Sequence, residues 1–158
     1  NNAGAFSGDL LLMAPADRFA KVLAANLLGA HVVTREAVKL MRAAGSGRVV
    51  SISSIAARLA VAGNGLYGTA KNALEHLMRD FAVEFRGSGV TFNSVEVSFV
   101  EDTSMVDALR PEARAKYEER LLVSRAVSLE EVAGAVEYLA STSAGSITGQ
   151  VISLGSPF

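Results

Sequence analysis

Short β-branched runs alternate with long amphipathic segments along this chain, and this alternation is the feature that most limits its fold. Three runs have the length and composition of strands: GRVVSISS (47–54), VTFNSVEVSFV (90–100) and GQVISLGS (149–156). Three segments carry helical spacing or a helix-start signal: 15–44, 67–85 and 128–141. Because parallel strands need helical crossovers, we predict an α/β fold in which three strands of a parallel sheet alternate with helices.

The chain opens on a loop-type cluster, NNAGAFSG, with no strand before it. Three parallel strands alone form a thin sheet with an unpaired apolar edge, so we expect further sheet upstream of Asn1. No repeat, linker or low-complexity tract divides the sequence, and we expect 1–158 to form a single, partial domain. The charged segment 110–121 is expected to be a short helix on an excursion from the core.

Composition and charge exclude several classes of function. With 15 basic and 16 acidic residues, the chain offers no electrostatic case for binding nucleic acid or an anionic membrane surface. The absence of cysteine excludes thiolate catalysis, disulfides and cysteine-ligated metal. His31 and His76 have no ligand partners at metal spacing, so no metal is expected. The early apolar stretch is too short to span a bilayer, and we expect a cytoplasmic protein.

Tyr67 and Lys71 fall on the apolar stripe of the helix expected over 67–85. At about 100° per residue Lys71 lies about 40° from Tyr67, whereas the charged residues, Glu75 among them, fall on a different face. On spacing alone, ordinary packing with a snorkelling lysine is the commoner explanation. Alternatively, an ammonium about 4 Å from the phenol would lower the phenol pKa by up to about 3 units and create an acid/base near neutral pH.

Two further polar residues precede this pair in the sequence. Ser54 ends the strand 47–54, thirteen residues before Tyr67, where its hydroxyl can reach the same end of the sheet. Asn26 lies in an otherwise apolar helical stretch, where an amide lowers helix propensity and requires hydrogen-bond partners. Taken singly, Ser54 can be a plain strand end and Asn26 can bond locally or face solvent. The ordered set of four favours a proton-transfer site.

Motifs throughout the chain resemble the C-terminal two-thirds of a short-chain dehydrogenase/reductase. They are NNAG at 1–4, Asn26, Ser54 in SISS, YGTAK at 67–71 and the closing ITGQVISL, in this order and at the family's spacings. The resemblance implies the C-terminal part of a Rossmann-like doubly wound parallel sheet. The glycine-rich dinucleotide fingerprint, which that family carries well upstream of NNAG, has no counterpart here.

The resemblance also implies an NAD(P)-dependent oxidoreductase that interconverts a secondary alcohol and a ketone through a tetrad. By analogy Tyr67 is the acid/base, and Lys71 lowers its pKa and holds the nicotinamide ribose. Ser54 orients the carbonyl, and Asn26 anchors a water that extends the proton relay. Further cofactor contacts are implied for Asn2, Ala3, Gly4, Val97, Ser98, Val100 and Thr103.

The family's oligomers and its substrate-covering loop can be placed on the sequence in the same way. The helices that carry Asn26 and Tyr67 commonly form the family's dimer and tetramer interface, so a homodimer or homotetramer is implied. The segment around 104–123 corresponds to the loop that covers the small-molecule alcohol or carbonyl substrate.

Two positions depart from the family pattern. Val97 and Ser98 stand where the family usually has a proline–glycine pair beside the nicotinamide, and one extra residue precedes Thr103. Together with the absent fingerprint, this leaves an alternative open: a truncated or degenerate homologue that acts as a structural or oligomerisation partner. NAD and NADP are not distinguished, because the discriminating residue would lie upstream, and the substrate is not identified.

Overall fold

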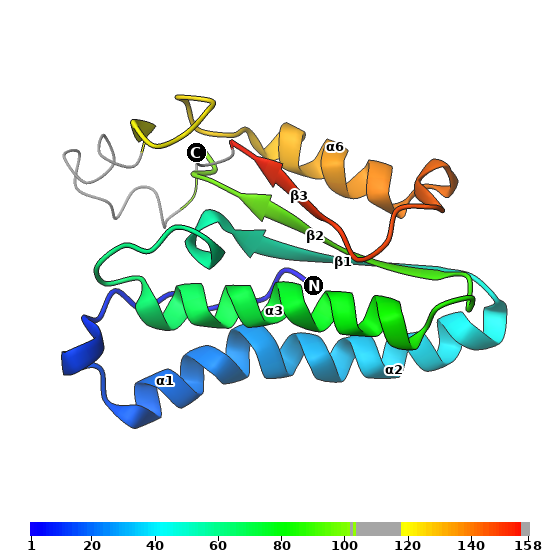
Figure 1. The fold of residues 1–158 in the computed structure, drawn as a ribbon, viewed down its shortest axis with the longest axis horizontal. Coiled ribbons are helices and arrows are strands. Elements are labelled where there is room, and N and C mark those ends of the chain that lie inside the picture. Colours follow the sequence, from blue (N-terminus) through cyan, green and yellow to red (C-terminus); the bar gives the residue numbers. More distant parts are fainter. Residues whose placement is uncertain (102, 104–117, 156–158) are drawn as a thin grey trace.

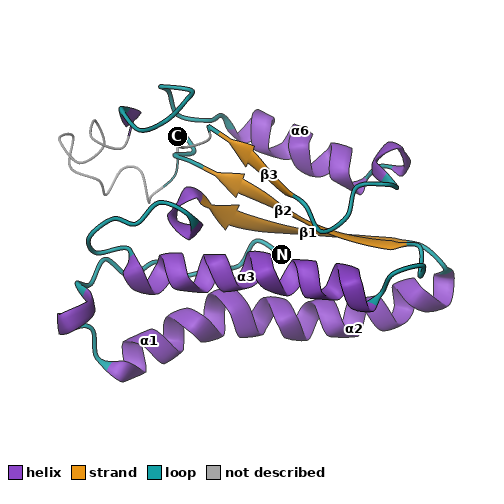
Figure 2. Ribbon diagram, viewed as in Figure 1, coloured by secondary structure: helices purple, strands orange, loops and turns teal. Residues whose placement is uncertain are grey.

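The computed structural model describes residues 1–101, 103 and 118–155, and these form a parallel α/β arrangement (Figure 1). The strands are β1 (Gly47–Ser54), β2 (Val90–Val97) and β3 (Val151–Leu154). They lie in the order β1-β2-β3, and both pairings are parallel. The longer helices are α1 (Ala16–Leu23), α2 (Gly29–Ala44), α3 (Gly65–Glu84) and α6 (Leu129–Ala140). The α/β fold with three parallel strands is therefore confirmed (Figure 2).

Alternate residues of each strand face two different helical layers. Val49 and Phe92 belong to the core shared with α2 and α3. The alternate positions Val50 and Val95 pack instead with Leu139 of α6. Helices therefore cover both faces of the sheet, as the strand periodicity of two requires.

The segment expected as one helix over 15–44 is helical throughout α1 and α2 but changes its hydrogen-bonding pattern in the middle. A π-helical turn, η2 (Ala24–Leu28), joins α1 to α2 and carries Asn26. Such turns are rare and occur frequently at functional sites. At the far end, Gly45 adopts a φ of 71° and closes α2 in the left-handed conformation, which a glycine takes up without a Cβ clash.

β2 is shorter than the strand expected over 90–100. Its pairing stops at Val97, and the chain bends at Ser98. Val100 pairs again only in an isolated bridge to Val127. The last three predicted strand residues therefore belong to a loop, because the sheet offers them no continuous partner.

The other predicted bounds shift by a few residues. β3 lies inside 149–156, since glycines with φ near 70°, Gly149 and Gly155, stand just outside its two ends. α3 begins at Gly65, two residues before the expected start. Most of the helix expected over 110–121 lies outside the described residues.

The capping box expected at the start of α6 is confirmed. Ser128 Oγ accepts from the backbone N–H of Glu131 at 3.2 Å, and Glu131 Oε2 accepts from the backbone N–H of Ser128 at 2.9 Å. Arg125 adds two further bonds to the same carboxylate, at 2.7 and 2.8 Å. The Arg125 side chain and the Ser128 backbone together lower the pKa of Glu131 to about 2.

Among the helices that the structure describes, none is long and apolar enough to cross a bilayer.

Candidate active site

Tyr67 lies in the first turn of α3, with 8% of its surface exposed. Phe6 packs against it edge to face, with ring centroids 5.5 Å apart and an interplanar angle of 76°. Lys71 Nζ lies 5.6 Å from the centre of the phenol ring. The structure therefore brings the tyrosine and the lysine together in one buried environment, as the helical wheel predicts.

Ser54 ends β1 and begins the short turn η3 (Ile55–Ala57). Its hydroxyl accepts a hydrogen bond from the backbone N–H of Ala56 at 3.2 Å. Burial raises the pKa of the Tyr67 phenol, and hydrogen bonding to the Ser54 side chain partly offsets that rise. The two hydroxyls are thus coupled, although the net direction is opposite to the lowering by Lys71 that the sequence predicts. The prediction did not include the deep burial of the Tyr67 phenol, which is the main cause of the raised pKa.

Lys71 is almost completely buried, with 4% exposure. Its ammonium donates to the backbone carbonyl of Ile52 at 2.8 Å, which fixes the amine beside the carboxyl end of β1. Burial lowers the pKa of Lys71 to about 8, because a cation is costly in a low-dielectric interior. The amine can therefore both release and take up a proton near neutral pH.

Asn26 is fully buried, and its side-chain amide is satisfied on one side only. Nδ2 donates to the carbonyl oxygens of Ala5 and Val22, at 2.8 and 2.9 Å. The expected need for hydrogen-bond partners is confirmed for this half of the amide. Oδ1 is buried without a partner. A buried amide oxygen without a hydrogen-bond donor is unusual, and it indicates a site where a water molecule could donate to Oδ1.

Gly4 brings the NNAG loop close to both Asn26 and Lys71. A Cβ placed at Gly4 would lie 2.5 Å from Asn26 Oδ1 and 3.6 Å from Lys71 Nζ. The two polar atoms therefore border the same small space, and a side chain at position 4 would fill it. Asn2 and Ala3 precede Gly4 on the exposed part of the loop.

The end of β2 adjoins the end of β1. Val97 pairs in register with Ser54, so the structure places the expected cofactor turn beside the expected catalytic serine. Ser98 Oγ is buried without a hydrogen-bond partner. Farther along the loop, Thr103 Oγ1 donates to the carbonyl of Val100 at 2.8 Å. The substrate-covering segment expected around 104–123 lies mainly outside the described residues.

A buried polar row that the sequence interpretation missed lies one residue before Ser54. Ser53, Glu96 and Ser153 are direct neighbours across the three strands. Arg58 binds the Glu96 carboxylate with both Nε and Nη2, at 2.9 and 2.5 Å. Period-two alternation along GRVVSISS and VTFNSVEV places Ser53 and Glu96 on one face of their strands, but the register between strands cannot be obtained from sequence.

Glu75 belongs to the same row, and its predicted position on a different face of the helix is wrong. It is 3% exposed, and Ser53 Oγ donates to its Oε1 at 2.6 Å. Glu75 stands about 80° around the helix from Tyr67, which is still within reach of the face that packs on the sheet. Burial raises the pKa of the Glu75 carboxyl, and hydrogen bonding to Ser53 opposes that rise.

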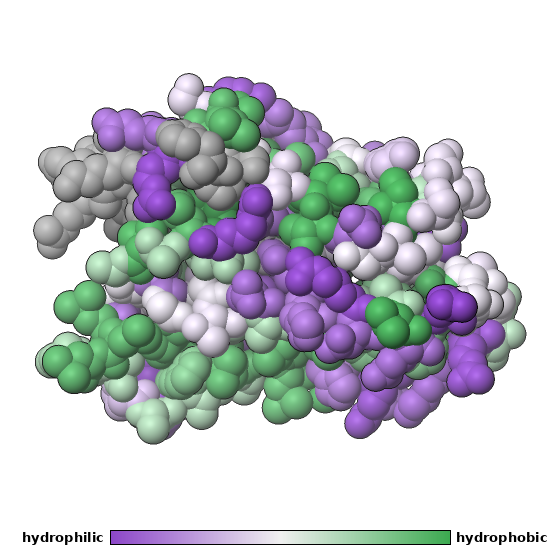
Figure 3. Space-filling model, in the orientation of Figure 1, coloured by the Kyte–Doolittle hydropathy of each residue, from purple (hydrophilic) through white to green (hydrophobic). Residues whose placement is uncertain are grey.

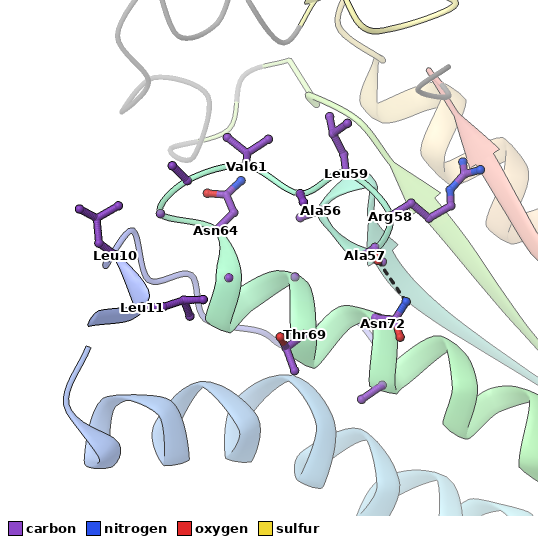
Figure 4. A pocket seen from close by; sticks show the side chains of 16 residues that line it. Leu10, Leu11, Ala56, Ala57, Arg58, Leu59, Val61, Asn64, Thr69 and Asn72 are labelled. Carbon is purple, nitrogen blue, oxygen red and sulfur yellow. Dashed lines mark hydrogen bonds between the residues drawn. The ribbon is translucent and has the colours of Figure 1, made fainter. Parts of the chain in front are cut away.

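A cavity of about 730 Å³ lies beside the site but does not contain the four predicted catalytic residues (Figure 4). It is enclosed by the loop after β1, by Leu10 and Leu11, and by the first turns of α3. The α3 residues that line it are Gly65, Gly68, Thr69, Asn72 and Ala73. These occupy the side of α3 away from Tyr67 and Lys71, so the cavity and the polar site are separate features.

A second, apolar groove of about 570 Å³ runs between the α1–α2 helix and α3. Both histidines border it, and His76 Nε2 lies 3.6 Å from Asp80 Oδ2. His31 packs near the ring of Phe81, with centroids 5.9 Å apart. Within the described part of the chain, no three histidine or carboxylate side chains gather as metal ligands.

Comparison with known proteins places these residues in a family. Residues 1–155 match the family model described as Enoyl-(Acyl carrier protein) reductase. The chain is 36% identical over 152 residues to the 3-oxoacyl-[acyl-carrier-protein] reductase FabG of Aquifex aeolicus, covering 96% of this chain and 61% of that protein. It is 34% identical over 152 residues to the 3-oxoacyl-[acyl-carrier-protein] reductase MabA of Mycobacterium avium, of which it covers 59%.

Solved structures share the fold at similar coverage. A protein of Agrobacterium tumefaciens, provisionally assigned as a gluconate dehydrogenase, superposes with a TM-score of 0.93 at 28% identity, over 98% of this chain and 61% of that one. A provisionally assigned NAD(P)-dependent gluconate 5-dehydrogenase of Beutenbergia cavernae, solved with NADP bound, gives 0.89 at 30% identity, over 96% and 61%. The chain thus spans about three-fifths of the proteins that it resembles.

Proposed function

The chain belongs to the short-chain dehydrogenase/reductase family, and on that premise we propose that it supplies the catalytic part of an NAD(P)-dependent oxidoreductase acting on a secondary alcohol and the matching ketone. The observation that carries the proposal is the meeting of Ser54, Tyr67 and Lys71 at the carboxyl end of β1. We propose the activity for the protein that contains this chain, with 1–158 as part of one domain.

The proposed chemistry is proton transfer at the substrate oxygen. In the direction of reduction, the Tyr67 hydroxyl donates its proton to the carbonyl oxygen, which the Ser54 hydroxyl holds by a hydrogen bond. A raised phenol pKa means that Tyr67 carries its proton at neutral pH and can donate it, although the same shift makes the phenol a weaker acid. In oxidation the Tyr67 oxygen accepts the alcohol proton. This requires the ionised phenol, and the raised pKa of Tyr67 makes ionisation at neutral pH more costly.

We assign Lys71 as the group that restores the proton that Tyr67 gives up, and Asn26 as the group that holds a water beside Lys71. Lys71, with a pKa of about 8, exists in both protonation states near neutral pH. The unpartnered Asn26 Oδ1 borders the same space as the Lys71 ammonium, next to Gly4. A water in that space would accept from Lys71 and donate to Asn26, and so continue the relay.

The residues present fit the nicotinamide end of an NAD(P) cofactor. When bound, the cofactor would supply or take up the hydride. Lys71 and Tyr67 would hold its ribose, and the end of β2 at Val97 and Ser98 would flank its ring. Ser98 Oγ, buried and without a partner, supports this placement because it is a polar atom that a carboxamide could satisfy. Asn2 to Gly4, Val100 and Thr103 remain proposed contacts.

Cofactor oxidation is the experiment that tests this function. The protein that contains this chain is titrated with NADPH and with NADH, and cofactor absorbance is followed with a panel of ketones that includes a 3-oxoacyl thioester, a substrate type taken from the names of FabG and MabA. We expect ketone-dependent oxidation of one cofactor. Binding of neither cofactor, together with a stable assembly of chains, would favour the alternative of a non-catalytic partner.

Self-association is proposed through the groove between the α1–α2 helix and α3. Leu28 lines the groove and is 57% exposed, and other apolar side chains of α2, such as Val33 at 61%, are exposed as well. Figure 3 shows hydrophobic residues gathered along the edge formed by α1 and the adjoining part of α2, while the far end of α2 is hydrophilic. The partner proposed is a second copy of this chain, in a homodimer or homotetramer.

Leu28→Asp is expected to shift the chain toward monomer, because it places a charge in the centre of an apolar contact. Sedimentation velocity measures the change, with an expected weakening of association of at least about tenfold. Leu122→Asp is the matched control, since Leu122 is exposed at 69% and lies far from this groove in the sequence and fold. Equal association of the wild type and Leu28→Asp would argue against this interface.

A further inference from the structure

The turn that begins at Ser54 is fastened to the sheet by a side chain at its other end. Arg58 follows η3, and its backbone N–H donates to the carbonyl of Ile55 at 3.0 Å, which closes the turn. Its guanidinium binds both oxygens of Glu96 and also donates to Ser153 Oγ at 2.9 Å. Arg58 also lines the neighbouring cavity, and Figure 4 shows its side chain reaching from the turn toward the sheet.

Glu96 is a rigid anchor for this contact. It is fully buried in β2, the central strand, and Ser153 Oγ donates to its Oε1 at 2.8 Å. A buried carboxylate is stable only when it is paired and hydrogen-bonded, so Glu96 requires the Arg58 guanidinium, although the Arg58 side chain itself is 48% exposed. Glu96 also stands immediately before Val97, which pairs with Ser54.

The opposite side of the turn is held by α3. Asn72 Nδ2 donates to the carbonyl of Ala57 at 3.1 Å. Gly68 has no Cβ, and one there would collide with the carbonyl oxygen of Ala56. The turn is therefore held by contacts to both the sheet and the helix. Because the backbone N–H of Ala56 donates to Ser54 Oγ, these contacts also fix the donor that the Ser54 hydroxyl binds.

We propose that Arg58 and Glu96 act as positioning residues, forming a strap that holds the turn after β1 so that the Ser54 hydroxyl faces Tyr67. The inference rests on the proposed function for its relevance to catalysis. The orientation of the Ser54 hydroxyl can be measured without turnover, so the strap and the proposed function can fail separately. Neither Arg58 nor Glu96 is assigned any contact with substrate or cofactor.

The ionisation of Tyr67 reports on the strap without any turnover. The chain has no tryptophan and three tyrosines, so tyrosinate absorbance during an alkaline titration is well isolated, and subtraction of Tyr67→Phe assigns the Tyr67 component. Hydrogen bonding to Ser54 lowers the pKa of Tyr67. Ser54→Ala therefore sets the upward shift that complete loss of the bond produces.

Arg58→Gln and Glu96→Gln are both expected to raise the pKa of Tyr67, each approaching the shift caused by Ser54→Ala. A pure charge effect gives a different result, because removing a cation raises a phenol pKa while removing an anion lowers it. Lys71 is retained in every variant, so its charge does not alter the comparison. Shifts of opposite sign for Arg58→Gln and Glu96→Gln would overturn the strap.

Three further variants complete the test. Arg58→Gln added to Ser54→Ala should cause no additional shift if Arg58 acts through Ser54, whereas additive shifts would contradict the proposal. Arg58→Lys, which keeps one charged hydrogen bond, should give an intermediate shift and keeps the test usable if the glutamine variant does not fold. Arg125→Gln breaks the other bidentate pair, with Glu131, and should leave the pKa of Tyr67 unchanged. These shifts in the pKa of Tyr67 can be measured even if the proposed oxidoreductase activity is absent, so the two proposals are tested separately.

Discussion

Tyr67→Phe is expected to reduce ketone-dependent cofactor oxidation by about 10² to 10⁴-fold while the protein remains folded. The substitution removes only the hydroxyl, and with it the proton donor at the substrate oxygen. The ring stays in place, so its edge-to-face contact with Phe6 and its packing near Lys71 persist. Steady-state turnover and the thermal midpoint of unfolding, measured on the same preparation, separate lost chemistry from lost structure.

Tyr138→Phe is the matched control for this loss. Tyr138 lies on α6 and is 53% exposed, so removal of its hydroxyl should leave turnover unchanged. If Tyr67→Phe retains the turnover of the wild type, Tyr67 is not the acid/base. A large fall in the unfolding midpoint of Tyr67→Phe would instead mean that its hydroxyl serves mainly to stabilise the fold.

The second large effect concerns Lys71 and the dependence of stability on pH. Burial lowers the pKa of Lys71 from 10.5 to about 8 in the folded chain. Between these values the unfolded chain binds more protons than the folded one, so the free energy of unfolding rises with pH. Below about pH 8, buried Lys71 lowers the free energy of unfolding by its full amount, and this loss disappears as the pH approaches 10.5, the pKa of lysine in the unfolded chain. The free energy of unfolding therefore rises by an amount on the order of 3 kcal/mol over this range.

Lys71→Met should remove this rise in stability. Urea unfolding between about pH 7 and pH 11 measures it, with the exposed Lys39→Met as control. The raised pKa of Tyr67 has the opposite effect, because the unfolded phenol ionises first and stability then falls as pH rises above about 10. The comparison is therefore made in the Tyr67→Phe background. Parallel stability curves for the two lysine variants would show that Lys71 carries no such cost.

Much of the fold follows from local signals in the sequence. The alternation of β-branched runs with amphipathic segments predicts the parallel sheet and its helices, since side-chain period and crossover length are local properties. The capping box at Ser128 and Glu131 is likewise a local pattern, and the structure confirms it. The buried amide of Asn26 can be anticipated because a polar residue in an apolar helical stretch must find partners.

The remaining features depend on interactions between distant residues. The row of Ser53, Glu96 and Ser153 exists only through the register between strands, which no single segment encodes. Burial of Glu75 depends on the Ser53 hydroxyl, which donates a hydrogen bond to its carboxylate from the neighbouring strand. The direction of the Tyr67 pKa was wrong for a related reason. Spacing places Lys71 near the phenol but cannot show how deeply the phenol is buried, and burial raises its pKa.

Transfer of deuterium tests the central claim most directly. The protein is incubated with a prochiral ketone and reduced cofactor that carries deuterium at the transferable nicotinamide position, and the alcohol is analysed by mass spectrometry. The proposed function predicts alcohol with one deuterium at the carbinol carbon from wild-type protein, and almost no alcohol from Tyr67→Phe. Alcohol without deuterium, equal yields of labelled alcohol from both proteins, or no alcohol from the wild type would contradict it.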